Sequence, residues 1–234
     1  MCTSWLSQNW LWGSSGYCPA SSQQIRREVG TETFDYPRSS AAYRVRIALE
    51  IKGLSYEKTK INLLEAEHRE SGYLELNPQG RVPSLQVGLG LLTQSLAIIE
   101  YLEEIYPEPA LLPSDSLQRA HVRSIAQTIA CDIHPLNNLQ VLQYLKGSLG
   151  VSEEAKLHWY HHWITEGFTA LEKIVEGTNY CFGENPTLAD VCLVPQCYNA
   201  RRFEVDLTPF PKLCRIEENL VKLSAFANAH PDRS

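Results

Sequence analysis

The chain has 234 residues, of which 44% are hydrophobic and 21% charged, and its formal net charge is −6. This length allows one large domain or two small ones, with a hydrophobic core that needs no disulfide or metal to hold it. A net negative charge without a basic tract argues against a general nucleic-acid partner, and no apolar run approaches the length that crosses a bilayer. We therefore expect no nucleic-acid partner and no membrane association.

Residues 1–29 differ in composition from the rest of the chain. They contain three of the five tryptophans, six serines and two glycines, and no sustained hydrophobic period. They also lack the basic segment and continuous apolar run of a secretory signal. We predict a disordered extension and assign it no function.

The cysteines indicate a reducing compartment. No two form a CxxC pair, and no cysteine and histidine spacing matches a zinc site. An odd number of scattered cysteines, several in apolar helical context, is typical of free thiols, so we expect the cytoplasm. The seven positions are Cys2, Cys18, Cys131, Cys181, Cys192, Cys197 and Cys214.

A strand followed by a well-capped helix opens the regular part of the chain. Residues 31–36 alternate as a short strand does, and Pro37 ends it. Ser39 and Ser40 are suitable N-caps, and Gly53 suits the position after the helix end. Exposed N–H groups and hydroxyls at a helix start favour an anion, and in particular a thiolate, although most serine pairs of this kind only cap a helix.

Residues 53–62 predict a second strand, so the first three elements form a βαβ unit with parallel strands. A short or irregular helix is expected over 65–73. Turn residues over 77–81 precede a strand that continues to Val87, and Gly88 and Gly90 turn the chain into a strand over 91–93. Pro83 has no N–H, which leaves the backbone of Val82 available to a partner outside the sheet; the isomer of this bond stays open.

A helix over 95–104, with Ser95 as N-cap, completes an α/β unit, and 109–113 reads as a linker. The remaining pattern is helical. We expect a long helix over 115–145, kinked at His134-Pro135, and further helices from Ser152 to about 174 and over 211–227. Thr187 and Asp190 match a capping box. The predicted organisation is an α/β domain over 30–107 and an all-α domain over 114–230.

Three histidines on the second long helix, His158, His161 and His162, have no fourth ligand at a sensible spacing. We interpret them as surface or packing residues and expect no metal.

Five segments together resemble the glutathione transferase family, most closely its zeta class, from about Phe34 to Pro231. They are Ser39–Arg46, Asn77–Pro83, Gln94-Ser95, Asp132–Asn138, and Ala189–Gln196 followed by Arg202-Phe203. The resemblance implies a thioredoxin-like N-terminal domain that binds glutathione and an all-helical C-terminal domain for the substrate. It also implies a homodimer.

The resemblance also implies site residues. Ser39 and Ser40 would lie beside the glutathione sulfur, Val82 would pair with the cysteinyl backbone, and Gln94 and Ser95 would hold the γ-glutamyl group. Further glutathione contacts are expected from His68, His134, Asn138, Leu139 and Gln140. Arg44 is a catalytic candidate beside the two serines, and Arg38 and Arg202 are candidates for binding the carboxylates of a diacid substrate. For Arg44 and Arg46, a solvated charge or an ion pair is an equally good interpretation.

The implied reaction is the glutathione-dependent cis–trans isomerisation of maleylacetoacetate to fumarylacetoacetate in tyrosine and phenylalanine catabolism. Alternatives are a maleylpyruvate isomerase, a general glutathione transferase, and a non-catalytic module of the same fold. The family pattern has cysteine where this chain has Ala41. Chemistry that depends on that cysteine is therefore not expected, and the nucleophile must come from glutathione. The first strand is more polar than is usual, so we expect a less well-formed N-terminal edge.

Overall fold

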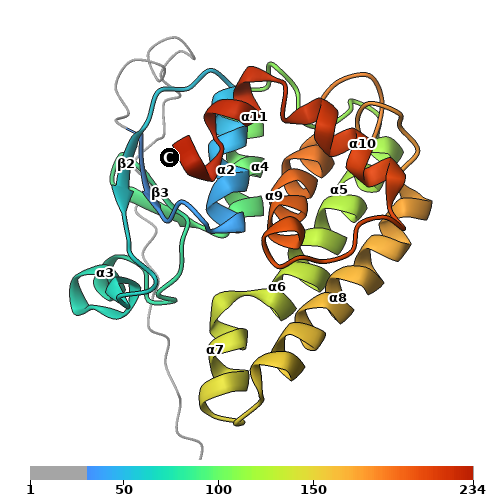
Figure 1. The fold of residues 1–234 in the computed structure, drawn as a ribbon. Helices are drawn as coiled ribbons and strands as arrows, with labels where there is room; N and C mark the ends of the chain where they lie inside the picture. The colour runs from blue at the N-terminus through green and yellow to red at the C-terminus, as the bar shows by residue number, and fades with distance from the viewer. Residues whose placement is uncertain (1–30, 234) are drawn as a thin grey trace, which may run out of the picture.

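A computed structural model describes residues 31–233, which form a small sheet with helices beside it and an entirely helical second half (Figure 1). The strands are β1 (Thr31–Asp35), β2 (Glu57–Lys60), β3 (Ser84–Val87) and β4 (Gly90–Thr93). Their order in the sheet is β2-β1-β3-β4. β1 runs parallel to β2, while β3 is antiparallel to both β1 and β4. The predicted βαβ unit and the hairpin are confirmed.

The expectation of a poorly formed N-terminal edge was wrong. β1 is an interior strand, with Phe34 opposite Thr59 of β2 on one side and Ser84 of β3 on the other. Its polar residues are engaged: Thr33 donates a hydrogen bond to the Glu57 carbonyl at 3.2 Å. Polar side chains are therefore compatible with a central position here, because the neighbouring strand supplies their partners.

The helices divide into two groups along the chain. The first contains α2 (Ser40–Ile51), the 3₁₀ turn η1 (Glu67–Arg69), α3 (Ser71–Leu76) and α4 (Ser95–Ile105). The second contains α5 (Ser116–Gln127), the π-helical segment η2 (Thr128–Ile133), α6 (His134–Asn137), α7 (Leu139–Gly147), α8 (Glu153–Ile174), α9 (Leu188–Arg202), α10 (Pro211–Leu220), α11 (Ser224–Asn228) and the 3₁₀ turn η3 (Pro231–Arg233). The predicted α/β unit followed by an all-α half is confirmed.

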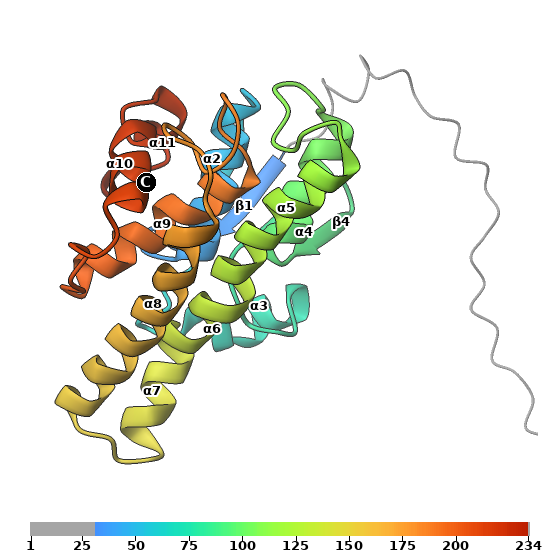
Figure 2. The ribbon, with the colours of Figure 1, turned by 90° about the vertical axis from the view of Figure 1, so that its right-hand side faces the viewer.

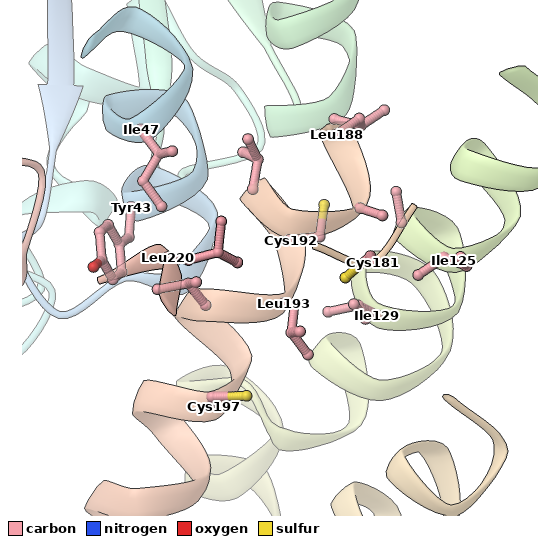
Figure 3. Close-up of a cluster of buried hydrophobic side chains, with 14 of the residues drawn as sticks. Tyr43, Ile47, Ile125, Ile129, Cys181, Leu188, Cys192, Leu193, Cys197 and Leu220 are labelled. Carbon is pink, nitrogen blue, oxygen red and sulfur yellow. The ribbon is translucent and has the colours of Figure 1, made fainter. Parts of the chain in front are cut away.

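Helix α2 lies at the centre of the molecule. It packs against α4 of the first group and against α9 and α11 of the second, and residues 42–49 are all buried. Figure 3 shows Tyr43 and Ile47 of α2 on one side of α9, and Ile125 and Ile129 on its other side. α9 therefore joins the two halves through one continuous hydrophobic core.

Two buried ion pairs hold α2 against its neighbours, one from the middle of the helix and one from its C-terminal end. Arg46 donates to both carboxylate oxygens of Asp35 on β1 at 2.7 Å and to the Ala229 carbonyl at 3.0 Å. Lys52, after the helix end, donates to Glu103 of α4 at 2.6 Å. Glu103 also accepts from the backbone N–H of Leu111, so α2, α4 and the linker are held together. Buried charges paired in this way are expensive to separate.

Three predicted helix boundaries were wrong. Gln94, not Ser95, is the N-cap of α4, because the Gln94 carbonyl accepts the first helical hydrogen bond, from Ile98 N at 2.9 Å. The single helix over 115–145 is instead broken twice, by η2 before His134 and by an extended Asn138 that caps α7. The last helix is also divided, because Leu223 is extended and starts α11.

The predicted extension over 1–29 lies outside the described residues. Within residues 31–233, no helix is both long and apolar enough to traverse a bilayer. Figure 2 shows the second half from the side, with α7 and the start of α8 extending beyond the sheet.

Candidate active site

The two serines at the start of α2 have different surroundings. Ser39 is the N-cap; it is half-buried, and its Oγ accepts from the backbone N–H of Ala42 at 3.3 Å. Ser40 is the first residue of the helix and is buried, and its Oγ accepts a hydrogen bond from the Asn199 side chain of α9. Ser39 is thus the more exposed of the two serines at the N-terminus of α2, where the partial positive charge of the helix favours a thiolate.

A second helix start lies beside the first. Ser95 begins α4, is buried, and accepts a hydrogen bond from Arg44 of α2, with 3.1 Å between Nη1 and Oγ. Gln94 has a φ of +70° and donates from Nε2 to the Gln79 side chain at 3.0 Å. The Gln94-Ser95 pair is therefore tied to α2 on one side and to the turn over 77–81 on the other.

The segment before β3 presents the backbone of Val82. The Val82-Pro83 bond is cis, which answers the question left open by the sequence. The preceding carbonyl, of Arg81, accepts from the Tyr73 hydroxyl at 2.6 Å and from the Asn77 amide at 2.8 Å. No turn or loop hydrogen bond among residues 31–233 uses the backbone of Val82. The hydrogen bonds to the Arg81 carbonyl therefore hold the chain just before Val82, while the backbone N–H and C=O of Val82 itself remain able to pair with a peptide.

The helical half reaches this region through α6 and α7. Burial, assisted by the positive charges of Arg44 and Arg81, lowers the pKa of His134 to about 3, so its imidazole is neutral at ordinary pH. Gln140 accepts from Arg81 across the two halves, with 3.1 Å between Nη2 and Oε1. Arg44, Arg81, Ser95, His134 and Gln140 therefore belong to one neighbourhood.

Two further predicted residues of α7 shape the turn before it. Asn138 is the N-cap: its Oδ1 accepts from Val141 N at 3.1 Å, and its Nδ2 donates to the Pro135 carbonyl at 2.8 Å. Both ends of this amide are engaged within the chain. Leu139, the first residue of α7, is half-buried.

The predicted arginines have four different environments. Arg44 is 2% exposed and has no ion pair among the described residues, so the alternative interpretation as a solvated charge or ion pair was wrong for Arg44; Arg46 does form an ion pair. Arg38 is exposed. Arg202 is also exposed and lies over the Phe203 ring at 5.1 Å, while Arg201 pairs with Glu217.

His68 stands apart from the other predicted residues. It is half-buried in η1, and its Nδ1 has no hydrogen-bond partner within residues 31–233. Burial, and secondarily the charge of Arg69, lowers its pKa. No hydrogen bond or ion pair in the described part of the chain links His68, Arg38 or Arg202 to another predicted residue.

The sequence interpretation missed three residues: Asn199, Arg81 and Gln79. Arg81 and Gln79 carried a weak signal, because both lie in the turn that leads to Val82. Asn199 carried none, since only the packing of α9 against α2 brings it to Ser40.

Two histidines of α8 make contacts of a structural kind. His161 is hydrogen-bonded to the Phe203 carbonyl at 2.7 Å, and His162 packs edge-on against Trp163.

The described residues contain no metal cluster, and three of their free cysteines are deeply buried. No group of three acidic, histidine or cysteine side chains there could hold a metal ion. Cys181, Cys192 and Cys197 are buried in the core, and burial raises the pKa of each thiol. Such thiols are poor nucleophiles.

Residues 30–104 match the family model for the glutathione S-transferase N-terminal domain. The chain is 51% identical over 201 residues to the maleylacetoacetate isomerase of Pseudomonas aeruginosa, an alignment that covers 85% of this chain and 94% of that protein. A holo structure of a maleylpyruvate isomerase, described as a bacterial glutathione S-transferase of the zeta class, is 44% identical with a TM-score of 0.85. That match covers 87% of this chain and 98% of the other.

A maleylacetoacetate isomerase from Anaeromyxobacter dehalogenans, solved with glutathione in its active site, is 42% identical with a TM-score of 0.81. It covers 88% of this chain and 97% of its own. The predicted fold, a thioredoxin-like domain followed by a helical one, is thereby confirmed. The chain belongs to the zeta class of the glutathione S-transferase family.

Proposed function

We propose that this protein is a glutathione-dependent isomerase that converts maleylacetoacetate to fumarylacetoacetate, a step in the breakdown of tyrosine and phenylalanine. The observation that carries the proposal is the pair of helix starts, Ser39 at α2 and Ser95 at α4, which Arg44 of α2 connects through its hydrogen bond to Ser95. They occur in a chain that is 51% identical to a protein named maleylacetoacetate isomerase.

The groups around these helix starts fit the chemistry of glutathione. Glutathione has a thiol, two carboxylates, an ammonium group and peptide groups, so its site must offer several donors and a free backbone. The start of α2 suits the sulfur, the backbone of Val82 suits the cysteinyl peptide, and the unpartnered Nε and Nη2 of buried Arg44 place positive charge near a carboxylate. The residues that would hold glutathione are Ser39, Ser40, His68, Val82, Gln94, Ser95, His134, Asn138, Leu139 and Gln140.

When bound, glutathione supplies the thiol nucleophile for the double bond of the substrate. The protein must then hold that sulfur as an anion, and Ser39 with the N–H groups of α2 is suited to do so. Arg38 lies just before the N-cap of α2, and Arg202 is the last residue of α9. Both are exposed, and both would bind substrate carboxylates. Ala41 offers no nucleophile of its own, so the reaction depends on glutathione.

A second candidate substrate is maleylpyruvate. Relatives named maleylpyruvate isomerase are 39% to 45% identical to this chain over most of its length. The same sulfur site and carboxylate-binding arginines serve both substrates, which share a cis double bond between carbonyl and carboxylate groups.

We also propose that the enzyme is a cytosolic homodimer. Its support is the family resemblance together with the free cysteines: Cys181, Cys192 and Cys197 are reduced and buried, as expected in a reducing compartment.

The test is an isomerisation assay on the purified chain. We expect conversion of maleylacetoacetate, and more slowly of maleylpyruvate, only when glutathione is present. S-methylglutathione, which keeps every binding group but lacks the thiol, is the matched control and should give no conversion. No conversion of either substrate with glutathione would overturn the proposal.

A further inference from the structure

Arg44 is a buried positive charge that the protein itself does not neutralise. It lies on α2, four residues after Ser40, and is 2% exposed. Its Nη1 donates to Ser95 Oγ at 3.1 Å, while Nε and Nη2 have no hydrogen-bond partner among residues 31–233. Its neighbour Arg46 is satisfied by Asp35 and two backbone carbonyls. Removing a guanidinium from water without a counter-ion is costly, so the position of Arg44 requires a reason.

The contact with Ser95 has only one possible direction. A guanidinium donates hydrogen bonds and cannot accept them, so the Ser95 oxygen must be the acceptor. The Ser95 proton must therefore point away from Arg44, and no other hydrogen bond of this hydroxyl occurs within the described residues. Ser95 is also the first residue of the eleven-residue helix α4, whose first N–H groups lack helical partners. A hydroxyl donor, backbone donors and a positive charge therefore lie close together at the start of α4.

The surroundings of Arg44 contain no acidic group to cancel its charge. Within residues 31–233, Arg44 interacts electrostatically with His134, Cys131 and Cys192, and Arg81 also acts on His134. No ion pair in the described part of the chain includes Arg44. The missing counter-charge is expected from a bound anion.

We propose that Arg44 is a positioning residue that acts through Ser95: it orients the Ser95 hydroxyl and adds positive charge at the start of α4. The site then selects the γ-glutamyl α-carboxylate of glutathione. This inference rests on the proposed function, and it changes the role predicted for Arg44 from a catalytic group to a determinant of cofactor recognition. Arg44 then affects glutathione affinity rather than the rate of the chemical step.

The experiment compares two ligands by calorimetry on the full chain: glutathione, and an analogue whose γ-glutamyl residue is replaced by 4-aminobutyrate and so lacks only that carboxylate. Wild type should prefer glutathione. Arg44→Met should weaken glutathione binding by roughly tenfold, as for a lost charge-assisted hydrogen bond, and leave binding of the analogue unchanged. Adding Ser95→Ala to Arg44→Met should cost little more, because the two residues act as one unit.

The matched control is Arg46→Met combined with Asp35→Asn, which removes the other buried arginine of α2 together with its partner. It should lower the unfolding temperature but keep the wild-type preference between the two ligands. Arg44→Lys, which retains the charge, should lose less affinity for glutathione than Arg44→Met, and it carries the test if the methionine variant does not fold.

The outcomes separate this inference from the proposed function. Equal weakening of both ligands by Arg44→Met, or fully additive effects of the Arg44 and Ser95 substitutions, would overturn the role of Arg44 while leaving glutathione as the cofactor. Failure of wild type to bind glutathione at all would overturn both.

Discussion

Ser39 and Ser40 are neighbours in sequence, but their hydroxyls have different partners. Ser40 is buried and hydrogen-bonded to Asn199 of α9, whereas Ser39 is half-buried and caps the N-terminus of α2. We therefore expect Ser39 to face the sulfur directly and Ser40 to hold the start of α2 against the helical half.

Asn199→Ala removes the donor to Ser40 and leaves a buried hydroxyl oxygen without a partner. We expect a loss of about 1 kcal/mol in the free energy of unfolding, measured by urea denaturation. Combining it with Ser40→Ala should add little further loss, because the two side chains share one interaction. Independent, additive losses would show that the contact contributes nothing.

His134 should produce a pH-dependent loss of stability. Its pKa is about 3 in the folded protein and about 6.5 when unfolded. Between these values the unfolded chain binds a proton that the folded chain does not, so stability falls as the pH falls. Wild type should lose more unfolding free energy than His134→Gln between about pH 7 and about pH 5. Equal losses would contradict a His134 that stays neutral in the folded protein.

At the residue scale, the sequence could indicate Ser39, Val82 and Gln94-Ser95, because helix starts and turns are local features. It could not indicate that Arg44 and Arg46 have different environments, since both lie in one apolar helix two positions apart. Their difference comes from distant strands and helices: β1 brings Asp35 to Arg46, whereas α4 brings only Ser95 to Arg44.

At the element scale, the π-helical segment η2 leads directly into His134, the first residue of α6, and packs against α8. A Cβ on Gly167 of α8 would lie 2.2 Å from Cδ1 and 2.3 Å from Cγ1 of Ile133, which is 2% exposed. This glycine therefore allows the close approach that sets the position of α6.

Gly167→Ala should lower the free energy of unfolding by about 1–3 kcal/mol despite the better helix propensity of alanine. In an Ile133→Ala background the same change should be neutral or stabilising, because the clash is gone. Gly147→Ala, at the end of α7 with nothing within 4 Å of the added Cβ, is the matched control and should not destabilise. Destabilisation by Gly167→Ala in both backgrounds would contradict this packing.

Element types were predictable where the period was strong, as in α2, α4, α8 and the hairpin. Element ends were less so. Asn138 and Leu223 interrupt predicted helices with extended backbone, and Asn138 does so as an N-cap, since its Oδ1 accepts from Val141 N. The predicted capping box at Thr187 and Asp190 is present, because both of its hydrogen bonds are local.

At the scale of the whole molecule, α2 belongs to both halves. Tyr43 donates to the Phe226 carbonyl at 3.4 Å and Arg46 to that of Ala229, so the last helices cover it. The proposed division into 30–107 and 114–230 therefore describes architecture rather than independent folding.

A fragment of residues 31–113 should not fold cooperatively, because it would expose the apolar face of α2 that α9 and α11 cover. The expected result is a broad, non-cooperative urea transition by circular dichroism, against a single sharp transition for the full chain. A two-state transition in the fragment would contradict this dependence.

The most direct test of the central claim is the thiol pKa of bound glutathione, followed by the ultraviolet absorbance of the thiolate. If the start of α2 is a thiolate site, the bound thiol should titrate well below about 8.5 in wild type. Ser39→Ala should return the pKa toward that of the free thiol. A bound thiol that titrates like free glutathione, or a lowered pKa that Ser39→Ala does not change, would contradict the assignment of α2 as the sulfur site.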